Sequence, residues 1–230
     1  MGSGCSAAKE VADVILVKDD FYATIQAVKW GRNIYHNVGR FLQFQVTVNL
    51  SVIFTIAIGA PILAESPFTA GQLLWINLIM DTFAAFALAT EPPLDSILAG
   101  PPYKHDEDVL TPAIWRQILG VSFWNVTVMT LMIIFGPSVA GFEYGYSTSV
   151  NDTPPTDESR AKTKHLTALY NTFVFLQVFN EINCRKIGRR DFNVFEKIHG
   201  NLYFLAVVAG TFALQFVTVN QFSGLLFPTT

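Results

Sequence analysis

Long apolar stretches alternate with short polar segments along this chain. Five stretches contain no Lys or Arg and run for 17–22 residues each, roughly Phe41–Ile62, Leu73–Thr90, Ile118–Gly136, Leu166–Ile182 and Leu202–Val219. A helix of that length crosses a hydrocarbon core of about 30 Å. Inside lipid the backbone must satisfy its own hydrogen bonds, which favours helices where no strand-like alternation is present. The pattern therefore predicts an all-α membrane protein with a five-helix transmembrane bundle.

The segment before the first stretch carries two shorter patterns. Val11–Leu16 is mostly apolar and predicts a short buried strand. Beyond Asp20, which is placed to cap a helix, apolar residues recur at helical spacing as far as Phe41. No Pro occurs between Asp20 and Ala60. We therefore expect an amphipathic stalk helix that continues directly into the first span.

The basic residues predict the orientation. Twelve Lys and Arg lie in the amino-terminal segment and in the loops after the second and fourth spans; the other side has only Arg160, Lys162 and Lys164. This bias places the amino terminus in the cytoplasm and the carboxy terminus outside. Met1–Asp20 is mixed and charged rather than a secretory signal, so the internal stretches should direct insertion. Gly136–Leu166 is aperiodic and predicts an external loop.

Composition agrees with a multi-pass membrane protein. Apolar residues make up 51% of the chain, charged residues 14%, and the mean hydropathy is +0.37. A soluble domain carries more charge. The net charge of −3 makes nucleic acid an unsuitable partner. Cys5 and Cys184 show neither metal-site spacing nor a disulfide framework.

Polar residues at mid-depth of the spans are the candidate functional groups, because they are costly in lipid. Asn77 and Asp81 are four apart in the second span and so share a helix face. Asp81 lies near the predicted bilayer midplane, and no span contains a basic residue to pair with it. Asn49 in the first span and Gln177 in the fourth are expected at overlapping depths.

These side chains are all oxygen donors, a chemistry that suits a hard cation such as Ca²⁺, which takes about six to eight oxygens. The alternative is that Asn49 and Gln177 only join helices by hydrogen bonds; this structural alternative is weakest for Asp81. Asn125 in the third span is interpreted as an interhelical contact. Glu181, at the end of the fourth span, is interpreted as an entry-rim or structural group within reach of interfacial water.

Three motifs resemble the P-type calcium-transporting ATPases, most closely the plasma-membrane, type IIB branch. Leu74–Asp81 (LWINLIMD) followed by Ala87–Pro93 (ALATEPP) is similar to their sixth transmembrane helix. Ala8–Leu16 together with Gly31–Tyr35 resembles the end of the phosphorylation domain and the stalk into the fifth helix, and Phe179–Lys186 resembles the end of the eighth.

The resemblance implies a site for the transported ion. It makes Asn77 and Asp81 ligands of the single Ca²⁺ site of that branch, with Asn49 matching an asparagine that lines it. Val52, Met80 and Gln177 stand where two-site pumps have a glutamate, a threonine and a glutamate, which argues for one ion per cycle.

The resemblance also implies the organisation of the chain. Residues 1–40 would be the end of an α/β phosphorylation domain, with Val11–Leu16 its strand remnant, and the stalk; residues 41–230 would be the cation-transporter membrane domain. The phosphorylation motif, the nucleotide-binding domain and four helices do not occur in the sequence. Mg-ATP would act only through those parts, in a missing amino-terminal half, so no catalytic or cofactor-binding residue is assigned.

Two functions fit these residues. The first is the cation-binding half of an ATP-driven pump that exports Ca²⁺ from the cytoplasm, in the plasma membrane or an endomembrane such as a vacuole, and that cannot hydrolyse ATP as an isolated chain. The second is a truncated, non-catalytic relative acting as a membrane scaffold or regulatory subunit. A small channel is disfavoured, because the stalk would have no role in it. Calmodulin binding is not inferable, since a regulatory tail would follow Thr230.

Overall fold

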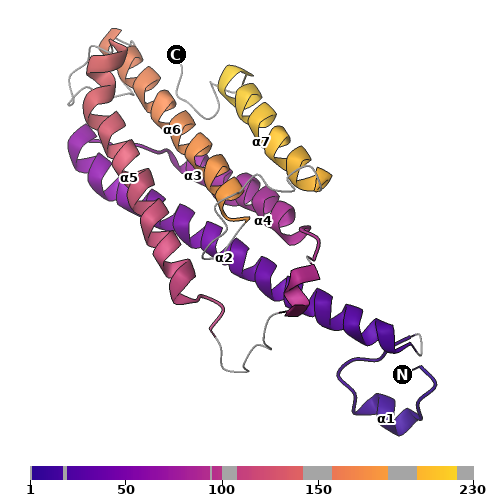
Figure 1. Cartoon of the computed structure of the whole chain (residues 1–230). Helices are drawn as coiled ribbons and strands as arrows, with labels where there is room; N and C mark the ends of the chain where they lie inside the picture. The colour runs from indigo at the N-terminus through magenta and orange to yellow at the C-terminus, as the bar shows by residue number, and fades with distance from the viewer. Residues whose placement is uncertain are drawn as a thin grey trace.

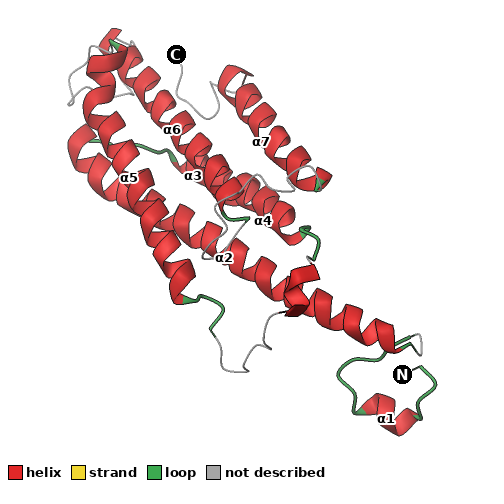
Figure 2. Cartoon of the chain, in the orientation of Figure 1, coloured by secondary structure: helices red, strands yellow, loops and turns green. Residues whose placement is uncertain are grey.

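The computed structural model of the chain describes residues 2–17, 20–93, 95–99, 108–141, 157–185 and 201–221. Their regular structure is entirely helical (Figure 2). The α-helices are α1 (Ser6–Glu10), α2 (Phe21–Leu63), α3 (Ala70–Trp75), α4 (Asp81–Ala89), α5 (Pro112–Ala140), α6 (Asp157–Asn183) and α7 (Leu202–Gln221). A π-helical turn, Ile76–Met80, joins α3 to α4, and a 3₁₀ helix spans Asp95–Ala99.

The bundle is built around α2, the longest helix (Figure 1). Helices α5 and α4 both pack against α2, α6 packs against α5, and α7 lies against α4 and α6. The α3–α4 segment runs back along α2 in the opposite direction (Figure 1). The first part of α2 projects from the bundle, and we call the end of the bundle from which it projects the stalk end and the opposite one the far end.

The predicted stalk helix is confirmed. Asp20 caps α2 by accepting a hydrogen bond from the Tyr22 backbone N–H (2.9 Å), and the helix continues for 43 residues. It ends at Leu63, where the Lys162 Nζ atom donates to the last carbonyl (3.1 Å). A lysine at this position satisfies a carbonyl that has no partner within its own helix.

The predicted strand at Val11–Leu16 is wrong. These residues form turn and coil, and the Val11 and Val14 side chains are exposed. A strand is stable only against a partner strand or a covering layer, and the described residues contain no other strand. The prediction failed because an apolar run indicates burial without supplying the sheet.

The span boundaries differ from those predicted. The second span is interrupted by the π-helical turn, and Gly136–Leu166 is only partly loop, since α5 extends to Ala140 and α6 begins at Asp157. Within the described residues, three segments are long and apolar enough to cross a membrane: Phe21–Leu63, Ala70–Ala89 and Pro112–Val139. Leu202–Thr218 is apolar but shorter. The five-span count is therefore not confirmed; α6 is a helix whose many polar residues reduce its hydropathy.

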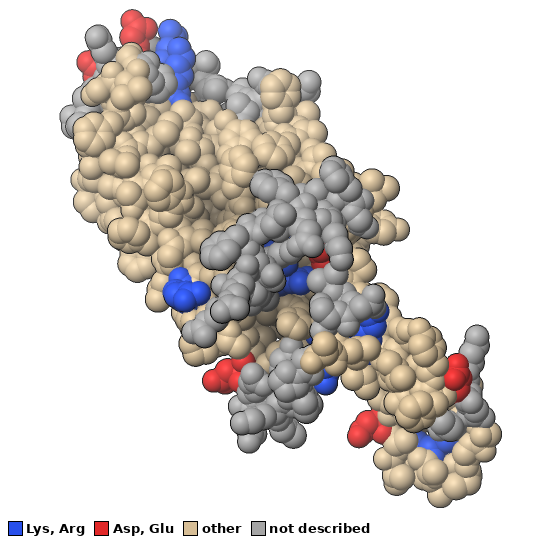
Figure 3. Space-filling view, in the orientation of Figure 1, with Lys and Arg blue, Asp and Glu red and all other residues tan. Residues whose placement is uncertain are grey.

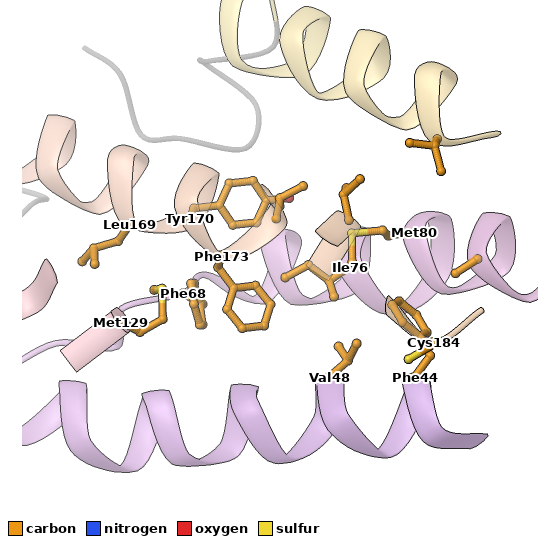
Figure 4. Close-up of a cluster of buried hydrophobic side chains, with 14 of the residues drawn as sticks. Phe44, Val48, Phe68, Ile76, Met80, Met129, Leu169, Tyr170, Phe173 and Cys184 are labelled. Atoms are coloured by element: carbon orange, nitrogen blue, oxygen red, sulfur yellow. The ribbon is translucent and has the colours of Figure 1, made fainter. Parts of the chain in front are cut away.

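The core fills the space between α2 and the opposing α4 and α6 (Figure 4). Phe44 and Val48 of α2 are fully buried, as are Tyr170 and Phe173 of α6. Phe68, from the α2–α3 connection, inserts between the helices with its ring 5.1 Å from that of Phe173. Aromatic rings at this separation gain both dispersion and quadrupole contacts.

On the face shown in Figure 3, the described Lys, Arg, Asp and Glu side chains lie at the far end of the bundle and, in the other half of the molecule, from the stalk end of the bundle along the projecting stalk. The described surface between these two regions is uncharged. Large apolar side chains are exposed along this band, including Phe123, Trp124 and Phe135 of α5 and Phe216 of α7. An uncharged apolar band between charged ends is typical of a protein that crosses a lipid bilayer.

Candidate functional site

The site forms where the α3–α4 segment crosses α2, and the π-helical turn marks the place. The Asp81 backbone N–H donates to the carbonyl of Ile76, five residues earlier, so one extra residue is inserted into the helix. Single π-turns inside α-helices are frequent at functional sites because they change the direction of the side chains that follow. Here the extra residue lies between Asn77 and Asp81, the two residues assigned from the sequence.

Asp81 is buried, with 6% of its surface exposed, and one of its oxygens is held by a residue of α2. The Gln45 Nε2 atom donates to Asp81 Oδ2 at 2.8 Å. The second carboxylate oxygen, Oδ1, is also buried and accepts no hydrogen bond from the described residues. A buried carboxylate without a cationic partner is unfavourable by several kcal/mol on its own. The arrangement therefore suits the binding of a positive charge.

Asn49 and Asn77 flank this contact. Asn49 follows Gln45 by four residues on α2, and Asn77 precedes Asp81 by four on the antiparallel segment. Both therefore lie about one helical turn from the Gln45–Asp81 contact, toward the far end. Both side chains are exposed. Asn77 donates from Nδ2 to the Leu73 carbonyl of its own helix (3.0 Å), which leaves its side-chain oxygen available.

Gln177 forms no hydrogen bond with Asp81, Gln45, Asn49 or Asn77. It is fully buried in α6, and neither of its amide atoms bonds to a described residue. The hydrogen-bonded helix contact considered from the sequence is therefore absent from the described structure. The structure joins Asp81 to Gln45 rather than to Gln177.

A second group of polar side chains joins α2 to α5. Asn125 Nδ2 donates to Ser51 Oγ, and Ser122 Oγ donates to the Thr47 carbonyl, both at 3.4 Å. The interpretation of Asn125 as an interhelical contact is confirmed. Ser51 itself donates to its own helix backbone. These residues hold the two helices together and are not part of the Asp81 group.

The stalk end holds a buried ion pair. Arg185, just after α6, donates to both carboxylate oxygens of Glu91, just after α4, at 2.8 Å (Nη2–Oε1) and 3.3 Å (Nε–Oε2). The guanidinium also lies over the Phe204 ring of α7, 4.8 Å from its centroid. Three helices of the bundle are thus joined at one point.

The stalk part of α2 contacts the same point. Asn33 Nδ2 donates to the Glu91 carbonyl (2.8 Å), and Asn37 Nδ2 donates to the carbonyls of Ala89 (3.2 Å) and Glu91 (3.3 Å). The Ala89 carbonyl ends α4 without an intrahelical partner, because the residue four positions later is Pro93, which offers no N–H; Glu91 lies just beyond the end of the helix. The helix that carries Asp81 is therefore fixed to the stalk.

Glu181 is not an exposed rim group. It is 1% exposed, and its Oε1 atom accepts no hydrogen bond from the described residues. Cys184, one turn later, is fully buried, and its Sγ–H group donates a hydrogen bond to Asn180 Oδ1 (3.6 Å). The expectation that Glu181 reaches interfacial water is wrong, because its side chain is buried within the bundle.

The described residues contain no group of three or more His, Cys, Asp and Glu side chains that could hold a metal ion. A site centred on Asp81 would consist of a single carboxylate and amide oxygens. Such a site would bind a hard cation more weakly than a cluster of carboxylates does.

Comparison with known proteins decides the family. A sequence model described as "Cation transporting ATPase, C-terminus" matches residues 65–230, which is more than half of the chain. This chain belongs to that family. The plasma membrane calcium-transporting ATPase 3 of Rattus norvegicus is 42% identical over 223 residues, which cover 96% of this chain and 17% of that protein. The plasma membrane calcium-transporting ATPase 4 of Bos taurus is 42% identical over 229 residues, which cover 99% of this chain and 18% of that protein.

The similarity confirms the resemblance deduced from the three motifs. The chain corresponds to the carboxy-terminal transmembrane part of cation-transporting ATPases of the plasma-membrane calcium type. It spans less than a fifth of the length of these relatives.

In this cation-transporting ATPase segment, Gln45 is a residue of the candidate site that was not predicted from the sequence. The signal was present: Gln45 precedes Asn49 by one helical turn and so lies on the same face of α2. A glutamine near the start of a span is easily attributed to the membrane interface. Only the register of α2 against α4 shows that it reaches Asp81.

Proposed function

We propose that this chain is the cation-binding membrane portion of an ATP-driven calcium pump that exports Ca²⁺ from the cytoplasm. The observation that carries the proposal is Asp81: a buried carboxylate whose hydrogen bond comes from a neutral amide and which has no Lys, Arg or His partner among the described residues. A structural carboxylate at this depth would be paired with a base. A carboxylate that binds a transported cation would have no such basic partner.

Asn49 and Asn77 are proposed as neutral oxygen ligands beside Asp81. Their position one turn from Asp81 on two antiparallel helices supports this role. Ca²⁺ takes about six to eight oxygens, so further ligands would come from the remaining helices of the complete pump. The ion is the cargo, and these residues bind and release it.

Energy from ATP would enter through parts of the pump outside this chain. Phosphoryl transfer needs an aspartyl nucleophile and a nucleotide site, and we assign neither to these residues. Movement of the stalk would then reach the ion site through the contacts that Asn33 and Asn37 make with the end of α4. The boundary near residue 40 between stalk and membrane domain, with the stalk cytoplasmic, belongs to this proposal.

A chimeric pump tests the function. The corresponding segment of a full-length plasma membrane calcium-transporting ATPase is replaced by residues 1–230, and ATP-driven ⁴⁵Ca uptake is measured in membrane vesicles. The proposal predicts uptake well above that of vesicles without the chimera. A chimera that reaches the membrane intact but transports no Ca²⁺, while binding other membrane proteins, would support the scaffold alternative instead.

A further inference from the structure

The contact between Gln45 and Asp81 leaves two acceptor oxygens without a hydrogen donor. Gln45 uses its Nε2 atom to donate to Asp81 Oδ2 (2.8 Å). Gln45 Oε1 and Asp81 Oδ1 are both buried, and neither accepts a hydrogen bond from the described residues. A buried acceptor without a donor is unfavourable by about 1–3 kcal/mol, so two of them in one contact require an explanation.

The hydrogen bond fixes the relative position of the two groups. The Gln45 amide and the Asp81 carboxylate are in direct contact through Nε2 and Oδ2. The two remaining oxygens therefore belong to adjacent groups, one on α2 and one on α4. Their chemistry is the pairing that a hard cation prefers, one anionic and one neutral oxygen. A cation bound there would satisfy both.

We propose that Gln45 is itself a ligand of the transported cation, binding through Oε1 while its Nε2 atom holds the Asp81 carboxylate in place. This inference rests on the proposed function and adds to the site a residue that the sequence motifs do not include. It also explains why the glutamine faces Asp81 although hydrocarbon disfavours an amide, since each end of the amide then has a partner.

The neighbouring Gln43 provides a matched comparison. It is the same residue type on the same helix, two positions earlier, and it is buried to 1% exposure. It lies on the side of α2 that faces Cys184, with which it interacts. Loss of Gln43 would therefore disturb packing at the stalk end without removing an oxygen from the Asp81 contact.

The test uses the chimeric pump and measures ⁴⁵Ca uptake over a range of free Ca²⁺ concentrations. Gln45→Leu removes both amide atoms at similar size and should raise the half-saturating Ca²⁺ concentration roughly 10- to 100-fold, the range typical for loss of a group that orients or supports a metal ligand. The maximal rate at saturating Ca²⁺ should change much less. Gln43→Leu should leave the half-saturating concentration within about threefold of the unsubstituted chimera, a shift below 1 kcal/mol.

A third variant separates a ligand from a residue that only positions Asp81. Gln45→Glu retains a side-chain oxygen, loses the N–H donor and adds a second negative charge beside Asp81, which a cation bound between the two groups would neutralise; the inference therefore predicts a smaller loss of Ca²⁺ affinity than for Gln45→Leu. A loss in Gln45→Glu equal to or larger than that in Gln45→Leu would show that only the donor matters, and the assignment of Oε1 as a ligand would be wrong. An unchanged half-saturating concentration in Gln45→Leu would also overturn it.

A failure of this inference can be distinguished from a failure of the proposed function. If the unsubstituted chimera transports Ca²⁺ and Asp81→Asn abolishes transport, the site at Asp81 stands whatever Gln45 does. If the unsubstituted chimera is folded but transports nothing, the proposed function fails first.

Discussion

Arg185 and Glu91, 94 positions apart in the sequence, form a two-point ion pair between the ends of α6 and α4. Arg185 is 3% exposed and its partner 16%. Together with the contacts from Asn33 and Asn37 to the same turn, the pair fixes the end of the helix that carries Asp81.

Removal of one partner of this pair should destabilise the chain. A buried charge left without its partner costs about 3–5 kcal/mol. Arg185→Met and Glu91→Gln should therefore each lower the thermal unfolding midpoint of the detergent-solubilised chain. The double variant should lose less than the sum of the two, with a coupling of roughly 0.5–3 kcal/mol. Additive losses would show that the two side chains do not interact.

The environment of His36 should make the stability of the folded chain depend on pH. It is half-buried on the stalk, and burial, with a smaller contribution from the nearby Arg40 guanidinium, lowers its pKa from the ordinary value of 6.5. The unfolded chain therefore takes up this proton at a higher pH than the folded chain does. Stability from this residue is present above about pH 6.5 and falls as the pH drops below it.

The matching experiment compares His36→Gln with the unsubstituted chain. The variant should lose less stability between pH 7 and pH 5.5 than the parent, as measured by thermal unfolding at each pH. An identical pH dependence of the two proteins would mean that His36 titrates alike in the folded and unfolded chain.

The predicted orientation can be tested by cysteine labelling, and the structure decides which residues are informative. Cys184 is buried and would react poorly from either side, whereas Cys5 is exposed. Asp157, at the start of α6, has a fully exposed side chain. An impermeant maleimide added to intact cells should label Asp157→Cys in a Cys5→Ser background, and should label Cys5 only after permeabilisation. The reverse pattern would contradict the orientation.

Much of the helical architecture could be predicted from the sequence. The continuous helix of α2 and its Asp20 cap follow from apolar periodicity and from the absence of Pro between Asp20 and Ala60. The positions of α4, α5 and α7 follow from the long apolar stretches. The apolar run Val11–Leu16 led to a wrong strand prediction, because a strand depends on a partner elsewhere that the run itself does not reveal. The π-helical turn at Ile76–Met80 leaves no recognisable pattern in hydropathy.

Part of the candidate site can be proposed from the sequence. Asp81 is one such residue, because a carboxylate within an apolar span is conspicuous. Gln45 is not, because its role depends on the register between two helices separated by 36 positions. The same limit applies to Glu91, whose partner Arg185 lies 94 positions away. Pairings of this kind are set by packing in three dimensions, which local patterns do not specify.

The most direct test of the account is Ca²⁺ transport by Asp81→Asn in the chimeric pump. This substitution preserves the size of the side chain and removes the negative charge, to which a divalent ion in a low-dielectric site is strongly attracted. Gln177→Ala provides a control, since Gln177 has no hydrogen bond to the described residues. The account predicts no ATP-driven ⁴⁵Ca uptake by Asp81→Asn at any Ca²⁺ concentration and a mild effect of Gln177→Ala. Near-normal uptake by Asp81→Asn would contradict it.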